Sequence, residues 1–221
     1  MTEARAAAAL FGGVALLERA VGYALGQLQA VTEAALPRPT PCHRWDLRAL
    51  LEHMDDSLAT MQEALELGSV DPEPAEYGPS RGGAGDAAEN LVAGLRARGC
   101  RLLGALADGD DAVVLIGGLP VPVQIVTSAG AVDLAVHGWD VARACGTGGA
   151  MPEQLAEDML GLVPLLVTDM DRPGRFDPAV AVPDGASAGD RLVGFLGRDP
   201  RWHRRHHPVG WWYDRASFLR G

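Results

Sequence analysis

Apolar residues recur every three or four positions along most of this 221-residue chain, the spacing that gives an α-helix one buried face. Prolines and glycines interrupt the pattern, notably in the connector 36–42 and in the stretch 69–85. The segments between the interruptions are long enough to form the antiparallel helices of a bundle. The pattern predicts helices over residues 2–32, 46–67, 86–107, 123–144 and 152–170, with a short helical piece over 188–196.

The predicted fold class is therefore all-α, a bundle of four or five helices. Residues 112–122 depart from it, because they are β-branched and punctuated by Gly and Pro, and a short strand, hairpin or extended link is expected there. The helical bundle is expected to occupy residues 1–170. Residues 171–221 are expected to form an irregular C-terminal extension that carries the short helix and a basic, aromatic tail.

Composition and charge exclude several classes of function. The net charge of −10 argues against binding of duplex nucleic acid. The chain contains no lysine, which excludes Schiff-base chemistry, lysine-anchored pyridoxal phosphate and a phosphate loop with its lysine. Its three cysteines are widely and irregularly spaced, so they form neither a zinc pair nor a disulfide framework. We expect a cytoplasmic protein that acts on a small molecule.

No apolar run approaches the ~20 residues that cross a bilayer, so no membrane partner is expected. The tail 201–221 holds five arginines against one aspartate, whereas the rest of the chain is acidic. This tail could close over an anionic or aromatic substrate, dock on the acidic body of a second subunit in a homodimer, or remain solvated.

The strongest chemical signal is the pair Asp133 and His137. Four residues apart on a predicted helix, a carboxylate and an imidazole share one face and can share a cation. His53 lies beside the apolar stripe of another predicted helix and is expected to face the core. Together these residues offer two nitrogens and one oxygen to zinc or a similar divalent ion, with one position open. A buried polar network without metal is the alternative.

Several neighbours of this trio are weaker candidates. Trp45 and Trp139 could line a substrate pocket, although tryptophans at helical spacing also serve as core residues. Asp140, three residues beyond His137, could orient that ligand from behind. Cys42 precedes a helix start, where a thiol pKa can be lowered, but a structural role is favoured for it.

Two sequence elements resemble the mycothiol-dependent maleylpyruvate isomerase-like proteins, which belong to the DinB-like metalloprotein bundles. One is the run Thr-Pro-Cys at 40–42 followed by Trp45 and His53, and the other is His-Gly-Trp-Asp at 137–140. Residues 175–202 resemble the tail segment of one branch of the family. The resemblance spans most of residues 1–202.

The resemblance implies that His53, Asp133 and His137 hold a divalent metal, generally zinc, which activates the thiol of mycothiol. Nickel is the second candidate ion. Asp133 stands where glutamate is usual in the family, and its side chain is one methylene shorter. The metal would therefore have to shift, or its affinity would fall.

The leading hypothesis is a metal- and thiol-dependent isomerase or S-transferase that acts on a small electrophilic metabolite. The first alternative is a metal-independent enzyme or small-molecule-binding protein on the same bundle, with Asp133 and His137 as an acid–base pair. The second is a dimeric structural or regulatory protein in which the trio forms a buried polar network.

Overall fold

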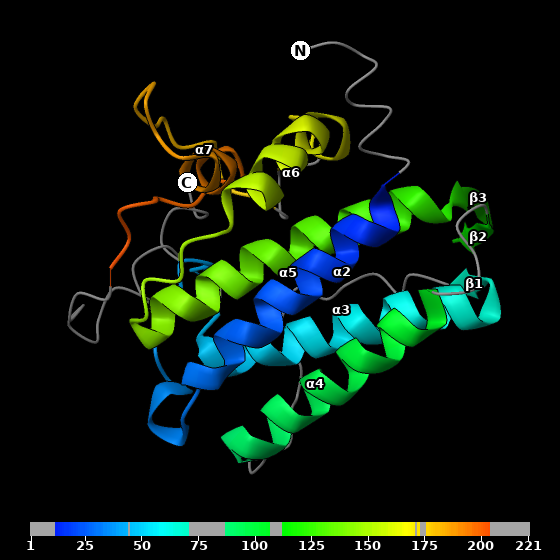
Figure 1. Ribbon diagram of the computed structural model, residues 1–221, viewed down its shortest axis with the longest axis horizontal. Helices are drawn as coiled ribbons and strands as arrows, with labels where there is room; N and C mark the ends of the chain where they lie inside the picture. The colour runs from blue at the N-terminus through cyan, green and yellow to red at the C-terminus, as the bar shows by residue number, and fades with distance from the viewer. Residues whose placement is uncertain are drawn as a thin grey trace, which may run out of the picture.

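The computed structural model describes residues 12–43, 45–70, 87–106, 112–170, 172 and 176–203, which are mostly helical (Figure 1). Two short 3-10 turns, η1 (Leu28–Ala30) and η2 (Glu33–Ala35), follow the first described helix. The helices are α2 (Gly13–Gln27), α3 (Leu47–Leu67), α4 (Ala88–Ala105), α5 (Val123–Cys145), α6 (Glu153–Leu166) and α7 (Ala188–Phe195). The predicted helical bundle is confirmed.

Helix α3 shows how closely local sequence and structure agree. The side chain of Asp46 caps its start by accepting a hydrogen bond from the backbone N–H of Ala49 at 2.9 Å. Gly68 ends it with a left-handed φ of 69°, which residues with a Cβ adopt at a cost. The apolar residues between Asp46 and Gly68 form a buried stripe. His53 lies beside this stripe, so its side chain is turned toward the bundle interior.

Helix α5 is the centre of the bundle and is buried around most of its circumference. Helix α2 runs along it, α3 and α4 pack on one side of this pair, and α6 and α7 lie on the other (Figure 1). The contact between α2 and α5 is close because small residues line it. A Cβ on Gly138 would lie only 2.9 Å from the Cα of Ala24 in α2.

A small three-stranded sheet closes one end of the bundle. Strands β2 (Val113–Ile116) and β3 (Leu119–Pro122) form an antiparallel hairpin, turned by Gly117 and Gly118 with φ of 57° and 78°. The hairpin was one of the forms expected for residues 112–122. Strand β1 (Ser69–Val70) adds to β2 in parallel, with Ser69 opposite Leu115, and this pairing was not predicted.

Helix α7 is attached firmly to the bundle. Its side chains Leu192 and Val193 are fully buried and belong to the same hydrophobic core as α2, α3 and α5. At its start, Ser187 accepts a hydrogen bond from the N–H of Asp190, and Glu153 of α6 accepts one from the N–H of Ala188. The short helix predicted over 188–196 is therefore present and packed.

Two predicted helices end several residues earlier than expected, at Gln27 and at Leu166. The helix expected over 2–32 is α2 within the described residues, and positions 2–11 lie outside them. The helix expected over 152–170 ends at Leu166, because Val167 is extended. Pro164 lies inside this helix and lacks the N–H that would bond to the carbonyl of Leu160, which weakens its last turns. Among the described helices, none combines the length and apolar content of a membrane span.

Candidate metal centre

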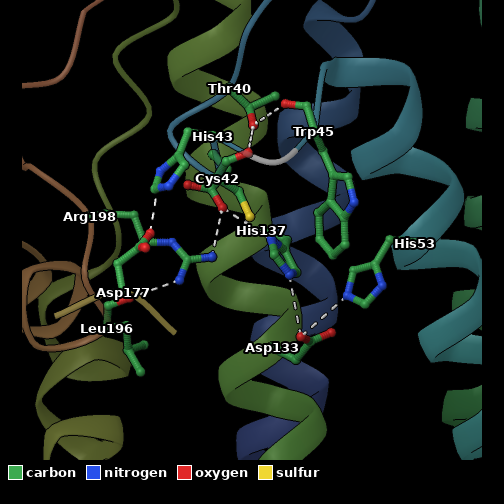
Figure 2. A network of polar contacts seen from close by, with 11 residues as sticks. Thr40, Cys42, His43, Trp45, His53, Asp133, His137, Asp177, Leu196 and Arg198 are labelled. Atoms are coloured by element: carbon green, nitrogen blue, oxygen red, sulfur yellow. Dashed lines mark hydrogen bonds and ion pairs between the residues drawn. The ribbon is translucent and has the colours of Figure 1, made fainter. Parts of the chain in front are cut away.

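The packing of α3 against α5 brings His53, Asp133 and His137 together (Figure 2). Oδ1 of Asp133 lies 3.4 Å from Nε2 of His137, one helical turn along α5, and 3.8 Å from Nε2 of His53. The two imidazole rings are 5.0 Å apart between centroids and nearly perpendicular. One potential ligand atom from each residue lies within 4.8 Å of the others, so a single small cation could contact all three.

The donor set fits a divalent transition metal, because two imidazole nitrogens and a carboxylate oxygen are common ligands of zinc. A second feature points the same way. Oδ2 of Asp133 is buried and has no hydrogen-bond partner among the described residues. A buried carboxylate oxygen is normally paired with a donor, water or an ion, and this one is left available.

Asp133 and His137 strongly shift each other's pKa values. Burial alone would raise the pKa of Asp133, but the positive charge of His137 and hydrogen bonds from His137 and His53 hold it well below its ordinary value. Burial alone would lower the pKa of His137, but the charge of Asp133 and hydrogen bonds to Asp133 and Asp140 raise it to about 9. Without a cation, the pair is therefore a carboxylate and an imidazolium at neutral pH.

Asp140 fixes the orientation of His137 from behind. Its Oδ2 lies 3.1 Å from Nδ1 of His137, and because a carboxylate only accepts, Nδ1 must donate. In a neutral imidazole, Nε2 then carries the free lone pair on the side of Asp133. The structure thus places Asp140 where the sequence suggested, next to the ligand that it could orient.

Trp45 covers the other side of the cluster. Its ring centroid is 4.3 Å from that of His53 and 5.8 Å from that of His137. The turn before α3 sets this position, because the hydroxyl of Thr40 bonds to the carbonyls of both Cys42 and Trp45 at 2.9 Å (Figure 2). Trp45 thus lies beside the trio.

Trp139 has a different environment. Its side chain is buried in the hydrophobic core, and the guanidinium of Arg143 lies over its ring, 4.7 Å from the centroid. This placement agrees with the core alternative that helical spacing allowed. Cys42 also differs from what a helix start suggests, because burial, partly offset by the charge of Arg198, raises its thiol pKa to about 12.

Comparison with protein families gives a match over the first part of the chain. The model of the mycothiol maleylpyruvate isomerase N-terminal domain covers residues 17–142, which is more than half of the chain. The chain belongs to this family. The resemblance seen in the two sequence elements is thus confirmed, and the bundle agrees with a DinB-like fold. No curated protein and no solved structure matches the chain significantly.

The match to the maleylpyruvate isomerase domain contains the trio and Asp140 but ends before α6 and α7. A residue of the cluster that sequence reasoning missed lies beyond that end. Arg198, just after α7, pairs with Asp140 at 3.2 Å and is only 8% exposed. In the sequence, Arg198 is marked only by its position after Gly197, at the end of a short apolar helix. That position does not reveal its pairing with Asp140.

His43 was also not singled out by the sequence analysis. It forms an exposed ion-pair contact with Asp177 at 3.3 Å, which joins the connector before α3 to the segment before α7 (Figure 2). It lies outside the group of potential metal ligands. His43 is therefore a useful comparison for the histidines of the trio.

Proposed function

We propose that this member of the maleylpyruvate isomerase domain family binds a divalent cation, zinc or nickel, at His53, Asp133 and His137. We further propose that it uses the cation with a thiol cosubstrate of the mycothiol type to isomerise a small electrophilic metabolite, or to act on it as an S-transferase in which the thiolate displaces a leaving group. The single observation that carries the proposal is the cluster itself: one donor atom from each of the three residues lies within 4.8 Å of the others, and the buried Oδ2 of Asp133 has no hydrogen-bond partner among the described residues.

A bound divalent cation supplies positive charge that favours the thiolate form of a thiol at neutral pH. The chain supplies the orientation. Asp140 accepts from Nδ1 of His137 and leaves Nε2 of that ring free to act as a ligand. Asp133, held anionic by its surroundings, contributes negative charge to the ligand set, so a divalent cation is favoured over a neutral guest.

Access to the cluster differs from one ligand to the next. The side chain of His137 is 7% exposed, whereas those of His53 and Asp133 are 31% and 35% exposed. A small molecule can therefore approach from the side of His53 and Asp133, where Trp45 offers an aromatic surface. This asymmetry supports binding of a cosubstrate or substrate on one face only.

The protein does not offer a thiolate of its own at this place. Cys42 is near the cluster, but its pKa of about 12 keeps it as the thiol at neutral pH. A thiol-dependent reaction here therefore needs a thiol from solution, which supports a small-molecule cosubstrate and agrees with the family.

The metal-free acid–base alternative keeps one observation in its favour. With a pKa of about 9, His137 is an imidazolium at neutral pH and could donate a proton to a small molecule. In this case Asp133 would stabilise the imidazolium and would be a poor base, because its own pKa is depressed. The pair would thus donate a proton to a small molecule but would accept one poorly.

Metal content separates these functions. Plasma mass spectrometry of tag-free protein is expected to find near-stoichiometric zinc or nickel in the native chain and in His43→Ala, and none in His137→Ala. His43 serves as the control because it is an exposed histidine outside the trio. Native protein that remains metal-free after incubation with zinc would overturn the proposal and leave the metal-free chemistry of His137 or a structural polar network.

A second experiment tests the thiol. Metal-loaded protein is supplied with mycothiol and a cis-configured, electron-poor olefinic acid, and isomerisation is followed by absorbance. The reaction is expected to require both the thiol and the metal and to be lost in His53→Ala. Loaded protein that gives equal rates with and without thiol would refute the thiol-dependent part of the proposal.

A further inference from the structure

Arg198 lies beyond residues 17–142, which the family model matches, but its guanidinium contacts Asp140 of the candidate metal centre. Its Nη2 donates to Oδ2 of Asp140 at 3.2 Å, and this same oxygen accepts from Nδ1 of His137 at 3.1 Å. A continuous chain therefore runs from Arg198 through Asp140 and His137 to Asp133. Two donors share one carboxylate oxygen, so displacement of one changes the bond to the other.

Asp140 depends on this pairing. Its side chain is completely buried, and an ionised carboxylate in such a place is costly unless it is paired. Its other oxygen, Oδ1, is buried and has no partner among the described residues. Within the part of the chain that the structure describes, Arg198 is the arginine that forms a salt bridge with Asp140, and protonated His137 is its other cationic neighbour.

Arg198 is held rigidly at the end of α7. Gly197 adopts a left-handed φ of 86°, its N–H donates to the carbonyl of Gly194, and the N–H of Arg198 donates to that of Val193. These two bonds form a Schellman motif, which fixes the direction of the chain beyond the helix. The Nη1 of Arg198 also donates to the carbonyl of Leu196 at 2.9 Å, so the guanidinium has little freedom.

We propose that Arg198 is a positioning residue of the metal centre: it holds the carboxylate of Asp140 in the place from which Asp140 directs His137 toward the cation. The proposal rests on the proposed function, because it assigns a role in metal binding. It makes α7 and the turn after it a part of the site, although the matched domain ends at residue 142. Removal of a residue that orients a metal-binding histidine lowers metal affinity about 10–100-fold.

The test measures zinc affinity by competition with a chromophoric chelator. Arg198→Met is expected to weaken zinc binding about 10–100-fold. Arg172→Met is the matched control, because Arg172 donates to the carbonyls of Asp177 and Phe195 in the same region but does not touch Asp140. It is expected to lose stability while its zinc affinity stays native. Native zinc affinity in Arg198→Met would overturn the proposal.

Arg198→Lys provides a second variant if Arg198→Met does not fold. Lysine keeps the charge but lacks the planar fork that serves Asp140 and Leu196 together, so an affinity between those of the native protein and Asp140→Asn is expected. An Arg198→Lys protein with zinc affinity as low as that of Asp140→Asn would also agree. One that folds and binds zinc like the native protein would count against the proposal.

A double-mutant cycle excludes a general structural effect. Asp140→Asn alone is expected to weaken zinc binding, and adding Arg198→Met to it is expected to cause little further loss, since Arg198 acts through Asp140. Independent effects that multiply in the double variant would show that Arg198 acts by another route and would overturn the proposal.

Nitrogen NMR of metal-free protein keeps this inference separate from the proposed function. At neutral pH the Nδ1–H signal of His137 is expected to be protected from exchange in the native chain and in Arg172→Met, and lost in Arg198→Met. If native protein binds no zinc, the proposed function fails, while this signal still decides whether Arg198 positions His137. A protected signal in Arg198→Met would refute the inference with or without metal.

Discussion

The indole ring of Trp45 lies against the imidazole of His53, with centroids 4.3 Å apart and planes tilted by 32°. The two residues sit on either side of the start of α3, and the Asp46 cap fixes that start. A change of charge at His53 therefore changes the electrostatic environment of the Trp45 ring, which is in direct contact with it.

Trp45 should therefore report metal binding. Zinc titration is expected to change the tryptophan fluorescence of the native protein, because it places a divalent cation at the imidazole that contacts the indole. Trp45→Phe should abolish the change, and Trp139→Phe should retain it, since Trp139 is buried in the core under Arg143. An undiminished response in Trp45→Phe would assign the signal to another tryptophan and contradict the prediction.

The stability of the metal-free protein should depend on pH through Asp133 and His137. The pKa of His137 is raised from 6.5 to about 9, so its contribution is complete below pH 6.5 and is lost as the pH rises through 9. The pKa of Asp133 is lowered from 3.8, so its contribution is complete above pH 3.8 and is lost as the pH falls further. Stability should be greatest between these limits.

The measurement is the free energy of unfolding in urea across this pH range. Asp133→Asn should remove most of the fall between pH 6.5 and 9, because the charge of Asp133 is the largest cause that raises the pKa of His137. Zinc-saturated protein should lack this fall, since zinc-bound His137 carries no proton and the unfolded histidine is also mostly neutral above pH 6.5. An unchanged slope in Asp133→Asn would disprove the assignment.

Close packing between α2 and α5 should make Gly138 intolerant of a methyl group. A Cβ at this position would lie 2.9 Å from the Cα of Ala24, so Gly138→Ala should destabilise the protein by about 1–3 kcal/mol. Gly22→Ala is the matched control in α2, where a Cβ meets nothing within 4 Å, and it should stabilise the helix by about 0.5–1 kcal/mol. Urea denaturation should give opposite signs for the two variants.

Cys42 should react slowly with thiol reagents. Its pKa of about 12 leaves little thiolate at neutral pH, whereas Cys100 is exposed on α4. Limited treatment with iodoacetamide, followed by peptide mass spectrometry, should find Cys100 modified before Cys42. Faster modification of Cys42 would contradict its assignment as a buried thiol and would reopen it as a nucleophile.

The parts of the fold that could be predicted are those where local signals agree. Helix α3 has a capping Asp46, a regular apolar stripe and a terminal Gly68, and each signal gives the same boundaries. Helix α6 could not be bounded in this way, because apolar residues continue beyond Leu166. Val167 is still buried although extended, whereas Met170 is 89% exposed, so apolar spacing there no longer reports a helix.

The residues of the candidate site also differ in whether local sequence signals predict their positions. Asp133 and His137 meet because four residues make one helical turn, and a sequence displays that spacing directly. Trp139 was ambiguous, because α5 is buried on nearly all sides and lacks an amphipathic pattern that would distinguish site from core. Arg198 reaches Asp140 only through the turn after α7 and its docking on the bundle, which no local spacing encodes.

His53 and the pair on α5 come from helices that α4 and the β2–β3 hairpin separate along the chain. The three donors can therefore act as a set only after distant segments have assembled, and the unfolded chain offers a cation no comparable site. A bound cation would add its binding free energy to the folded state alone and would slow unfolding more than it speeds folding. Cellular metal supply would then govern how long each copy of the protein survives proteolysis, and with it the protein's abundance.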